Sequence, residues 1–331
     1  MRGNVVSAMN IIPSTFNQRQ VNYTVLWGNE KVKRNSLNVS CILLNRNSTQ
    51  FRKIALENLL AKNFSEIISV EKNGESFNTT SLSHTYPGVK FIIAQEEVTE
   101  GDLLNIGMQE VSTEYVLVVH DDLCWQPLNF NQNLISKFIS EDKFCIAPRL
   151  FTNTNQVLPV SMVPTIDGQT FTVEHGLYIK EGLPTLFPVD YTGFYNVEKF
   201  KSLGGCDFTI TSEYWQKLDL FMRAWLWGEE ILLSSLFSFT FSGDYPAENL
   251  DADPSYIRFY LKNLLPVYKI DHAVIPSGSF HTFKKTSRYS LAKAIELFKM
   301  ARKWTEENQN RFKTDAANLI LKWGSVNESG K

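Results

Sequence analysis

The sequence has few of the features that mark a secreted, zinc-binding or membrane-spanning protein. Its 331 residues include four cysteines, none in a CxxC pair, and five histidines without HxxxH or HExxH spacing. The usual zinc motifs are therefore absent. The most apolar late stretch, residues 231–241, is too short to cross a bilayer, and residues 1–16 lack an apolar run of secretory length. These absences predict reduced thiols and a cytoplasmic protein.

The sequence also lacks an excess of charge of one sign. The 33 Lys and Arg residues nearly balance the 35 Asp and Glu residues, for a formal net charge of −2. A dedicated nucleic-acid binder is normally strongly basic, so we expect no nucleic-acid partner. A content of 43% hydrophobic and 21% charged residues excludes a disordered chain or a coiled coil. Aromatic residues, at 13%, are abundant; they fill cores and also line sites for sugars and other flat ligands.

Short apolar runs alternate with segments of helical periodicity through the first half of the chain. Runs at 39–47, 66–74, 89–95, 114–123 and 144–151 predict strands, and residues 54–60 and 101–112 predict helices. This alternation is typical of an α/β protein whose mostly parallel sheet is flanked by helices. Ligands of such sheets bind at the carboxyl ends of the strands. The residues at the predicted strand exits are Asn45, Arg46, Glu71, His120, Asp121 and Asp122.

The strongest local motif is VLVVHDDL, residues 116–123, in which two adjacent carboxylates follow a buried strand. Adjacent carboxylates repel each other, and a divalent cation would relieve the repulsion. Mg²⁺ and Mn²⁺ are commonly held by one or two carboxylates together with the phosphates of a ligand. The alternative is a solvated turn, or an Asp that caps the next helix.

The order of these features resembles the family 2 glycosyltransferases of the GT-A fold. After the strands come glycines and an asparagine on a helix, the Asp pair, and then residues 191–228 with a glycine loop, Gly-Gly-x-Asp and an acidic helix carrying an Arg. The resemblance covers about residues 38–285. It implies a mostly parallel GT-A sheet, a nucleotide-diphosphate sugar as donor and a divalent metal, Mn²⁺ or Mg²⁺. The helix glycines and asparagine are Gly101, Asn105 and Gly107.

The resemblance also implies roles for single residues. Leu44, Asn45 and Arg46 lie where the family cradles the nucleotide, and Glu71 stands where it usually places an Asp for the base or ribose. Gly101, Asn105 and Asp121 complete the implied donor site, and Gly193 and Trp215 lie on the implied acceptor side. For the metal, Asp122 matches the second Asp of the DXD motif, Asp121 offers a further carboxylate, His120 replaces the first Asp, and His281 could reach back from a flexible segment. Histidine suits Mn²⁺ better than Mg²⁺.

The general base departs from the family pattern. Inverting members use a carboxylate to deprotonate the acceptor hydroxyl, but the matching positions here are Gln216 and Lys217. Glu213 lies one helical turn earlier and is our first candidate; Asp219 and Asp190 are alternatives. A further alternative is a catalytically weak or inactive protein that binds nucleotide sugar or glycan. A nucleotidyltransferase is disfavoured, because residues 43–53 contain no glycine.

The resemblance divides the chain into three parts. Residues 1–36 are an N-terminal extension with a possible hairpin at Gly28-Asn29, residues 37–285 are the glycosyltransferase domain, and residues 286–331 are C-terminal helices. Residues 284–303 hold seven bases and one acid at near-helical apolar spacing. Such a helix can rest on an anionic membrane surface, here the inner face of the membrane, and would suit a glycan or lipid-linked acceptor in polysaccharide synthesis. A helix packed on the catalytic domain is the alternative.

Overall fold

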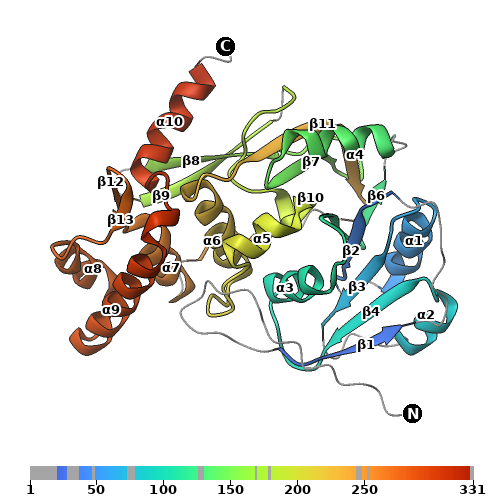
Figure 1. Cartoon of the computed structure of the whole chain (residues 1–331), viewed down its shortest axis with the longest axis horizontal. Helices are drawn as coiled ribbons and strands as arrows, with labels where there is room; N and C mark the ends of the chain where they lie inside the picture. The colour runs from blue at the N-terminus through green and yellow to red at the C-terminus, as the bar shows by residue number, and fades with distance from the viewer. Residues whose placement is uncertain are drawn as a thin grey trace.

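A nine-stranded sheet forms the centre of the molecule (Figure 1). The computed structural model describes residues 21–27, 37–46, 49–72, 79–125, 130–167, 170–177, 180–243, 248–251 and 254–328. The strand order is β1-β4-β3-β2-β5-β10-β7-β11-β6. The strands are β1 (Tyr23–Trp27), β2 (Ser40–Leu44), β3 (Ile67–Glu71), β4 (Val89–Ala94), β5 (Tyr115–His120), β6 (Leu123–Trp125), β7 (Cys145–Phe151), β10 (Gly193–Asn196) and β11 (Ile231–Phe241).

Four neighbouring strands, β4, β3, β2 and β5, run parallel to one another. Every residue of β2, β3 and β5 is buried, as expected for strands covered on both faces. The antiparallel pairs lie elsewhere in the sheet: β1 on β4, β10 between β5 and β7, and β6 on β11. The α/β fold with a mostly parallel central sheet and C-terminal helices is confirmed.

Helices α1, α2, α3 and α5 contact strands of this sheet, and α3 and α5 each contact α6. A capping box between Thr99 and Asp102 fixes the start of α3, and α3 packs on β2 and β3. The helices are α1 (Thr49–Leu60), α2 (Thr79–Thr85), α3 (Glu100–Glu110), α4 (Gln132–Glu141), α5 (Val197–Leu203), α6 (Glu213–Leu226), α7 (Pro254–Phe259), α8 (Ser279–Ser287), α9 (Leu291–Asn308) and α10 (Ala316–Glu328). Two small hairpins complete the fold, β8 (Ser161–Asp167) with β9 (Thr170–Gly176), and β12 (Val267–Lys269) with β13 (His272–Val274).

The N-terminal segment contributes to the sheet. β1 lies within the predicted extension and pairs antiparallel with β4, with Tyr23 opposite Ala94. The hairpin predicted at Gly28-Asn29 lies outside the described residues. All four cysteines are described and free, and Cys41, Cys145 and Cys206 are buried, in agreement with reduced thiols.

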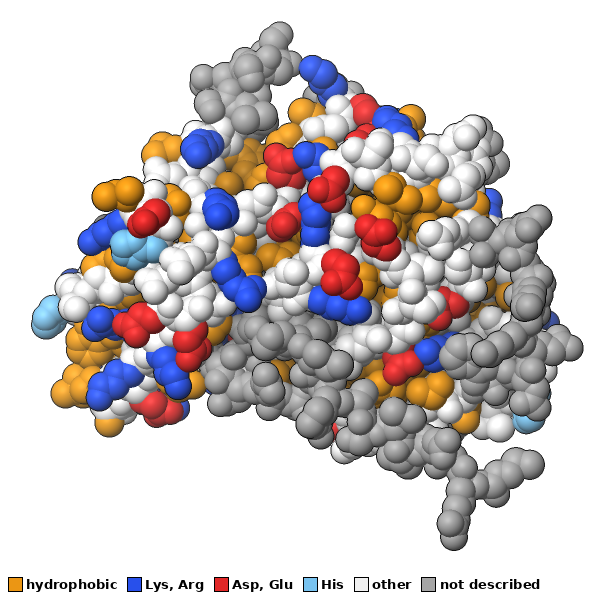
Figure 2. Space-filling view, viewed as in Figure 1, with side chains coloured by type: hydrophobic (Ala, Val, Ile, Leu, Met, Phe, Trp, Pro, Cys, Tyr) orange, Lys and Arg blue, Asp and Glu red, His pale blue; other side chains and the backbone are white. Residues whose placement is uncertain are grey.

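The C-terminal helices gather at one end of the molecule in Figure 1, where α8 and α9 share a small second core. Three bases of the predicted basic segment pair with acids on their own helix: Lys293 with Glu296, Arg302 with Glu306, and Lys303 with Glu307. Figure 2 shows Lys and Arg interspersed with Asp and Glu at this end. Among the described residues, no helix is both long and apolar enough to cross a membrane. The peripheral membrane contact stays a prediction.

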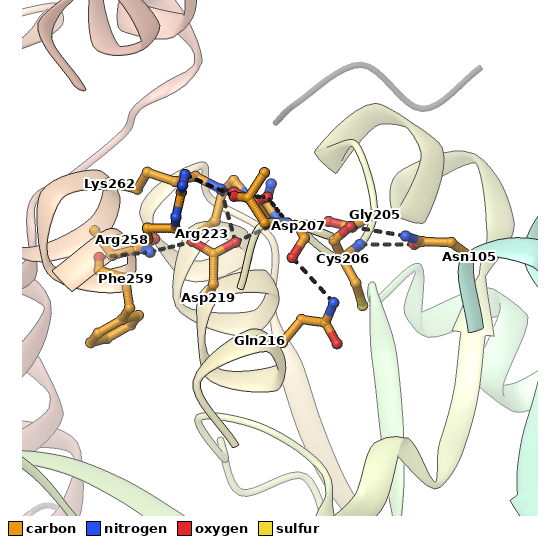
Figure 3. A network of polar contacts seen from close by, with 12 residues as sticks. Asn105, Gly205, Cys206, Asp207, Gln216, Asp219, Arg223, Arg258, Phe259 and Lys262 are labelled. Atoms are coloured by element: carbon orange, nitrogen blue, oxygen red, sulfur yellow. Dashed lines mark hydrogen bonds and ion pairs between the residues drawn. The ribbon is translucent and has the colours of Figure 1, made fainter. Parts of the chain in front are cut away.

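A buried polar network joins this end to the sheet domain (Figure 3). The ammonium of Lys262, in the π-helix η2 (Tyr260–Leu264), lies 2.9 Å from Asp207 and 3.0 Å from Asp219. Arg223 pairs with Asp219 at 3.2 Å, and Asn263 donates to its other oxygen at 2.7 Å. All five side chains are buried. Burial alone would raise the pKa of Asp207, but Lys262 outweighs it and lowers the pKa. Two carboxylates are therefore neutralised by two cations inside the protein.

Replacing Lys262 with Met should destabilise the protein by about 3–5 kcal/mol, because it leaves a buried carboxylate without its cation. The free energy of unfolding in urea, followed by tryptophan fluorescence, measures the loss. Lys285→Met on exposed α8 is the matched control and should change stability by less than about 0.5 kcal/mol. Because Lys262 lowers the pKa of Asp207, its stabilisation is complete at pH 7 and fades as the pH falls below about 4. An equal loss at pH 7 and pH 3 would contradict this account.

Candidate donor and metal site

The carboxyl ends of β2, β3 and β5 bring the predicted site residues to one edge of the sheet. The register places Leu44 opposite both Val70 and His120. The backbone carbonyl of Leu44 accepts a hydrogen bond from the Asp121 N–H at 3.2 Å. Leu44 is fully buried, so it positions the Asp pair through its backbone. The next residue, Asn45, donates to Ser69 at 3.0 Å, while its buried Oδ1 has no hydrogen-bond partner in the described chain.

The side chain of Arg46 lies among carboxylates. Its Nη1 is 3.1 Å from Asp190 Oδ2 and 3.9 Å from Asp122 Oδ2, and its Nε is 3.7 Å from Glu100 Oε1. Its backbone N–H donates to Asp121 Oδ1 at 3.0 Å. Three carboxylates therefore lie against one guanidinium at the edge of the sheet, and a fourth, Asp121, is held by the backbone of the same residue.

Burial and this guanidinium shift the acids in opposite directions. Burial raises the pKa of Glu100 to about 7 and that of Asp121 to about 6. Burial also acts to raise the pKa of Asp190, but the charges of Arg46 and Lys217 outweigh it and lower the pKa. The ionised form of Asp190 is thus held by Arg46, whereas Glu100 and Asp121 are under-compensated.

Two consecutive residues with left-handed backbone lie beside this cluster. Asp190 has φ 47° and Tyr191 has φ 56°, which is costly for residues with a side chain. His120 Nε2 lies 2.7 Å from the Asp190 carbonyl, and the Tyr195 hydroxyl donates to the Tyr191 carbonyl at 2.7 Å. The turn is therefore held from the sheet, by β5 on one side and β10 on the other.

His120, the last residue of β5, supports this turn. The ring is buried, and burial lowers its pKa to about 4, so it is neutral at pH 7. A neutral ring whose Nε2 donates to the Asp190 carbonyl leaves Nδ1 as an acceptor, 3.6 Å from Glu100 Oε1. His120 therefore supports the turn through Nε2, and its predicted role as a metal ligand stays a prediction.

The Asp pair fits a divalent cation that shares its coordination with a ligand. Asp121 Oδ2 and Asp122 Oδ1 are buried and have no hydrogen-bond partner among the described residues. Asp121 is only 2% exposed, so an unpartnered ionised oxygen there is costly. Hard oxygen donors suit Mg²⁺ and Mn²⁺. Within the described residues no group of three or more His, Cys, Asp or Glu could hold a metal ion. The remaining ligands would have to come from a bound diphosphate.

Two residues predicted to bind the nucleotide sugar, Glu71 and Asn105, make contacts within the protein next to the site. Glu71 is 1% exposed, pairs with Arg52 and accepts from Thr79 at 2.7 Å, so its charge is already compensated. Asn105 exchanges two hydrogen bonds with the backbone of Cys206, at 2.9 and 2.8 Å. Both side chains are therefore engaged in protein contacts.

The predicted glycines mark close packing. A Cβ on Gly193 in β10 would lie 2.7 Å from Cys145 Sγ. A Cβ on Gly101 in α3 would collide with the Gln216 side chain. Both positions need glycine because neighbouring side chains occupy the space of a Cβ, and neither glycine by itself marks a ligand contact.

Three further predicted residues lie away from the cluster. Asp219 is fully buried in the network of Figure 3, where Arg223 and Lys262 neutralise its charge, and its predicted role as a base stays a prediction. Trp215 is 6% exposed, donates to the Asp251 carbonyl at 2.9 Å and packs against Tyr256, which leaves no free indole face for a sugar. His281 is exposed on α8, at the far end of the molecule from α3 and β2 in Figure 1.

Glu100 is a site residue that the sequence analysis missed, and Lys217, named there only as a departure from the family pattern, also acts on the site. Glu100 occupies the first turn of α3, and the Thr99 capping signal could have placed it at this sheet edge. Lys217 pairs with Glu248 and its ammonium lies 4.9 Å from the centre of the Phe187 ring. Its charge reaches Asp190, so the position is part of the site's electrostatics.

Glu213 lies on the surface near the site. It begins α6, and its carboxylate is 3.4 Å from the ammonium of Lys72, the residue that follows β3. Its side chain is 56% exposed. The pKa of Glu100 is raised mainly by burial, then by the charge of Asp190, and to a smaller extent by the charge of Glu213. Glu213 therefore faces solvent beside the carboxylate cluster.

Solved structures share this fold, although no protein-family model and no curated protein sequence matches the chain. The structure of GalNAc-T7 with UDP, GalNAc and Mn²⁺ matches with a TM-score of 0.56 at 13% identity, over 83% of this chain and 56% of that one. S. aureus TarS matches with a TM-score of 0.49 at 14% identity, over 67% of this chain and 38% of that one. The structure of S. aureus TarS 1-349 in complex with UDP matches with a TM-score of 0.46 at 14% identity, over 78% of this chain and 69% of that one.

The chain has a GT-A-like nucleotide-sugar transferase fold. It spans little more than half the length of the GalNAc-T7 structure, 56%. At 13% identity the likeness shows the fold alone, so the chemistry has to be argued from the residues of this chain.

His120→Ala should lower the free energy of unfolding by about 1–3 kcal/mol, because the left-handed turn loses a buried hydrogen bond. Thermal or urea unfolding measures the loss, with exposed His84→Ala on α2 as the matched control. A cation-ligand role for His120 makes the opposite forecast: Mn²⁺ binding would weaken while the stability of the free protein stayed the same.

Proposed function

We propose that the protein is a metal-dependent glycosyltransferase that moves a sugar from a nucleotide-diphosphate donor to a hydroxyl acceptor. One observation carries the proposal: Arg46 and the Asp121-Asp122 pair converge at the carboxyl edge of the sheet with buried, unpartnered oxygens. The GT-A-like fold supports it, since ligands of such sheets bind at this edge. The GalNAc-T7 structure holds UDP, GalNAc and Mn²⁺.

The donor would be bound by groups that the folded chain leaves available. The buried Oδ1 of Asn45 can accept a hydrogen bond from the nucleotide. The guanidinium of Arg46 can donate to the diphosphate, the kind of anion for which its planar fork is suited. Asp121 and Asp122 would hold Mn²⁺ or Mg²⁺ against the same diphosphate. The cation would neutralise the charge that develops on the leaving diphosphate.

Glu213 is the general base that we propose. It would take the proton of the acceptor hydroxyl as that oxygen attacks the anomeric carbon, while the bond from this carbon to the diphosphate oxygen breaks. The nucleoside diphosphate leaves and the configuration inverts. Glu213 is exposed to an incoming acceptor, whereas Asp190 is paired with Arg46 and has a lowered pKa, which makes it a weaker base. A glycan or lipid-linked hydroxyl in polysaccharide or glycoconjugate synthesis is the acceptor class that we propose.

A binding protein without efficient turnover is the second candidate. The ion pair of Lys217 with Glu248 favours it, because Lys217 stands where the family resemblance expects a carboxylate. Such a protein would bind the nucleotide sugar at the same residues and leave the sugar in place. Binding and turnover must therefore be measured separately.

UDP together with Mn²⁺ should raise the thermal unfolding midpoint, because a ligand that binds only the folded state stabilises it by about 2.7 kcal/mol at a hundred times its Kd. Differential scanning fluorimetry with UDP, GDP, CDP and dTDP, each with and without Mn²⁺ or Mg²⁺, identifies the nucleotide. Asp122→Asn should abolish the metal-dependent part of the shift. If no nucleotide shifts the midpoint under any condition, the proposed function is wrong.

Glu213→Gln should lower kcat for sugar transfer by about 10²–10⁴-fold, because it removes the general base. The Kd for the nucleotide, measured by calorimetry, should stay within twofold. Glu306→Gln on α9, exposed and remote from the cluster, is the matched control and should retain full turnover. Full turnover in Glu213→Gln would exclude it as base. Tight donor binding with no turnover in the unchanged protein would favour the binding role.

A further inference from the structure

Arg46 forms ion pairs with several carboxylates at the edge of the sheet. It contacts Asp190, Asp122 and Glu100 through two different nitrogens. Its contact with Asp122 is the longest of the three, at 3.9 Å, and involves Oδ2. The other oxygen, Oδ1, is buried without a hydrogen-bond partner in the described chain. One oxygen of Asp122 therefore contacts the Arg46 guanidinium, and the other is the one that would bind a cation.

The guanidinium itself is incompletely used. Its Nε and Nη2 are buried and make no hydrogen bond within the part of the chain that the structure describes. Its side chain is only 19% exposed, so these donors are largely withdrawn from water. Leaving buried charged donors without acceptors is costly. An anionic ligand that accepted from these two nitrogens would remove that cost.

We propose that Arg46 couples the binding of the nucleotide to the binding of the divalent cation. In the free protein its positive charge lies against Asp122 and repels a second cation. When the diphosphate binds, it accepts from Arg46 and adds negative charge, so the carboxylates become available to the metal. This inference rests on the proposed donor site and adds to it a positioning residue that sets the order of binding.

Coupling of this kind has a signature that a purely structural role lacks. Thermodynamic linkage requires that UDP increase the affinity for Mn²⁺ by the same factor as Mn²⁺ increases the affinity for UDP. Removing Arg46 should strengthen the binding of Mn²⁺ without UDP, because the cation loses a competitor for Asp122. It should weaken the binding of UDP without metal, because the diphosphate loses a hydrogen-bond donor. Loss of a merely structural arginine would weaken both.

The test is a Mn²⁺ titration of the full chain, with free Mn²⁺ measured by its electron paramagnetic resonance signal, with and without UDP. Arg46→Met removes the charge but keeps the backbone N–H that donates to Asp121. Arg46→Lys keeps the charge without the planar fork. Lys53→Met, exposed on the neighbouring helix α1, is the matched control. UDP affinity without metal is measured by calorimetry for each protein.

Arg46→Met should bind Mn²⁺ about tenfold more tightly without UDP and bind UDP about tenfold more weakly without metal. The factor by which UDP tightens the binding of Mn²⁺ should fall, and it should stay above one because the diphosphate itself would still supply metal ligands. Arg46→Lys should keep the Mn²⁺ affinity of the free protein and lose much of the coupling, which gives a second reading should the Met variant fold poorly. Lys53→Met should match the unchanged protein.

Unchanged or weaker Mn²⁺ binding by Arg46→Met would overturn the inference. So would coupling in the Lys and Met variants equal to that of the unchanged protein. Failure of the proposed function looks different, because the unchanged protein would then bind none of the four nucleoside diphosphates, with or without Mn²⁺; should another of them bind in place of UDP, the same titrations are made with that nucleotide.

Discussion

The buried ion network around Lys262 is the constraint on which the geometry of the site depends. Lys262, Asp207 and Asp219 bring the π-helix, the loop after α5 and helix α6 to one point. The same loop is clamped to α3 by Asn105 through the backbone of Cys206. Because α3 begins at Glu100, a chain of polar contacts runs from the C-terminal helices to the edge of the sheet where Arg46 lies. Charges buried this deeply add little net stability, but they fix one arrangement of the parts they join.

Left-handed backbone and unpartnered charged atoms occur together at this edge. The left-handed pair Asp190-Tyr191, the orphan oxygens of the Asp pair and the unused donors of Arg46 lie in contact with one another or with shared neighbours. Elsewhere, the fully buried carboxylates Asp207 and Asp219 are each paired with a cation. Buried charges without partners beside a sheet edge are typical of a ligand-binding site. We propose that the missing partners are an anion for Arg46 and a cation for the aspartates.

The sequence predicted the strands, the order of the motifs and the residues at the strand exits, because continuous apolar runs and their polar ends are local signals. It could not predict what each exit residue contacts. Glu71 proved to be neutralised by Arg52, Trp215 to be packed under Tyr256, and Asp219 to be paired inside the core. These outcomes depend on residues distant in the chain. Glu100 was missed for a related reason: a single acid in a first helical turn is common, and only the fold brings it to Arg46.

Gln216 and Lys217, which stand where the family resemblance expects a catalytic pair, have structural roles in this chain. Gln216 is fully buried, donates to the Asp207 carbonyl at 3.1 Å and fills the space beside Gly101 at the start of α3. Lys217 is neutralised by Glu248. Both positions thus stabilise the junction of α6 with its surroundings. A carboxylate in place of Gln216 would be buried near Asp207 and Asp219, in a network whose charges already balance. In the mechanism that we propose, the acid that meets the acceptor is Glu213, which lies in the exposed first turn of α6.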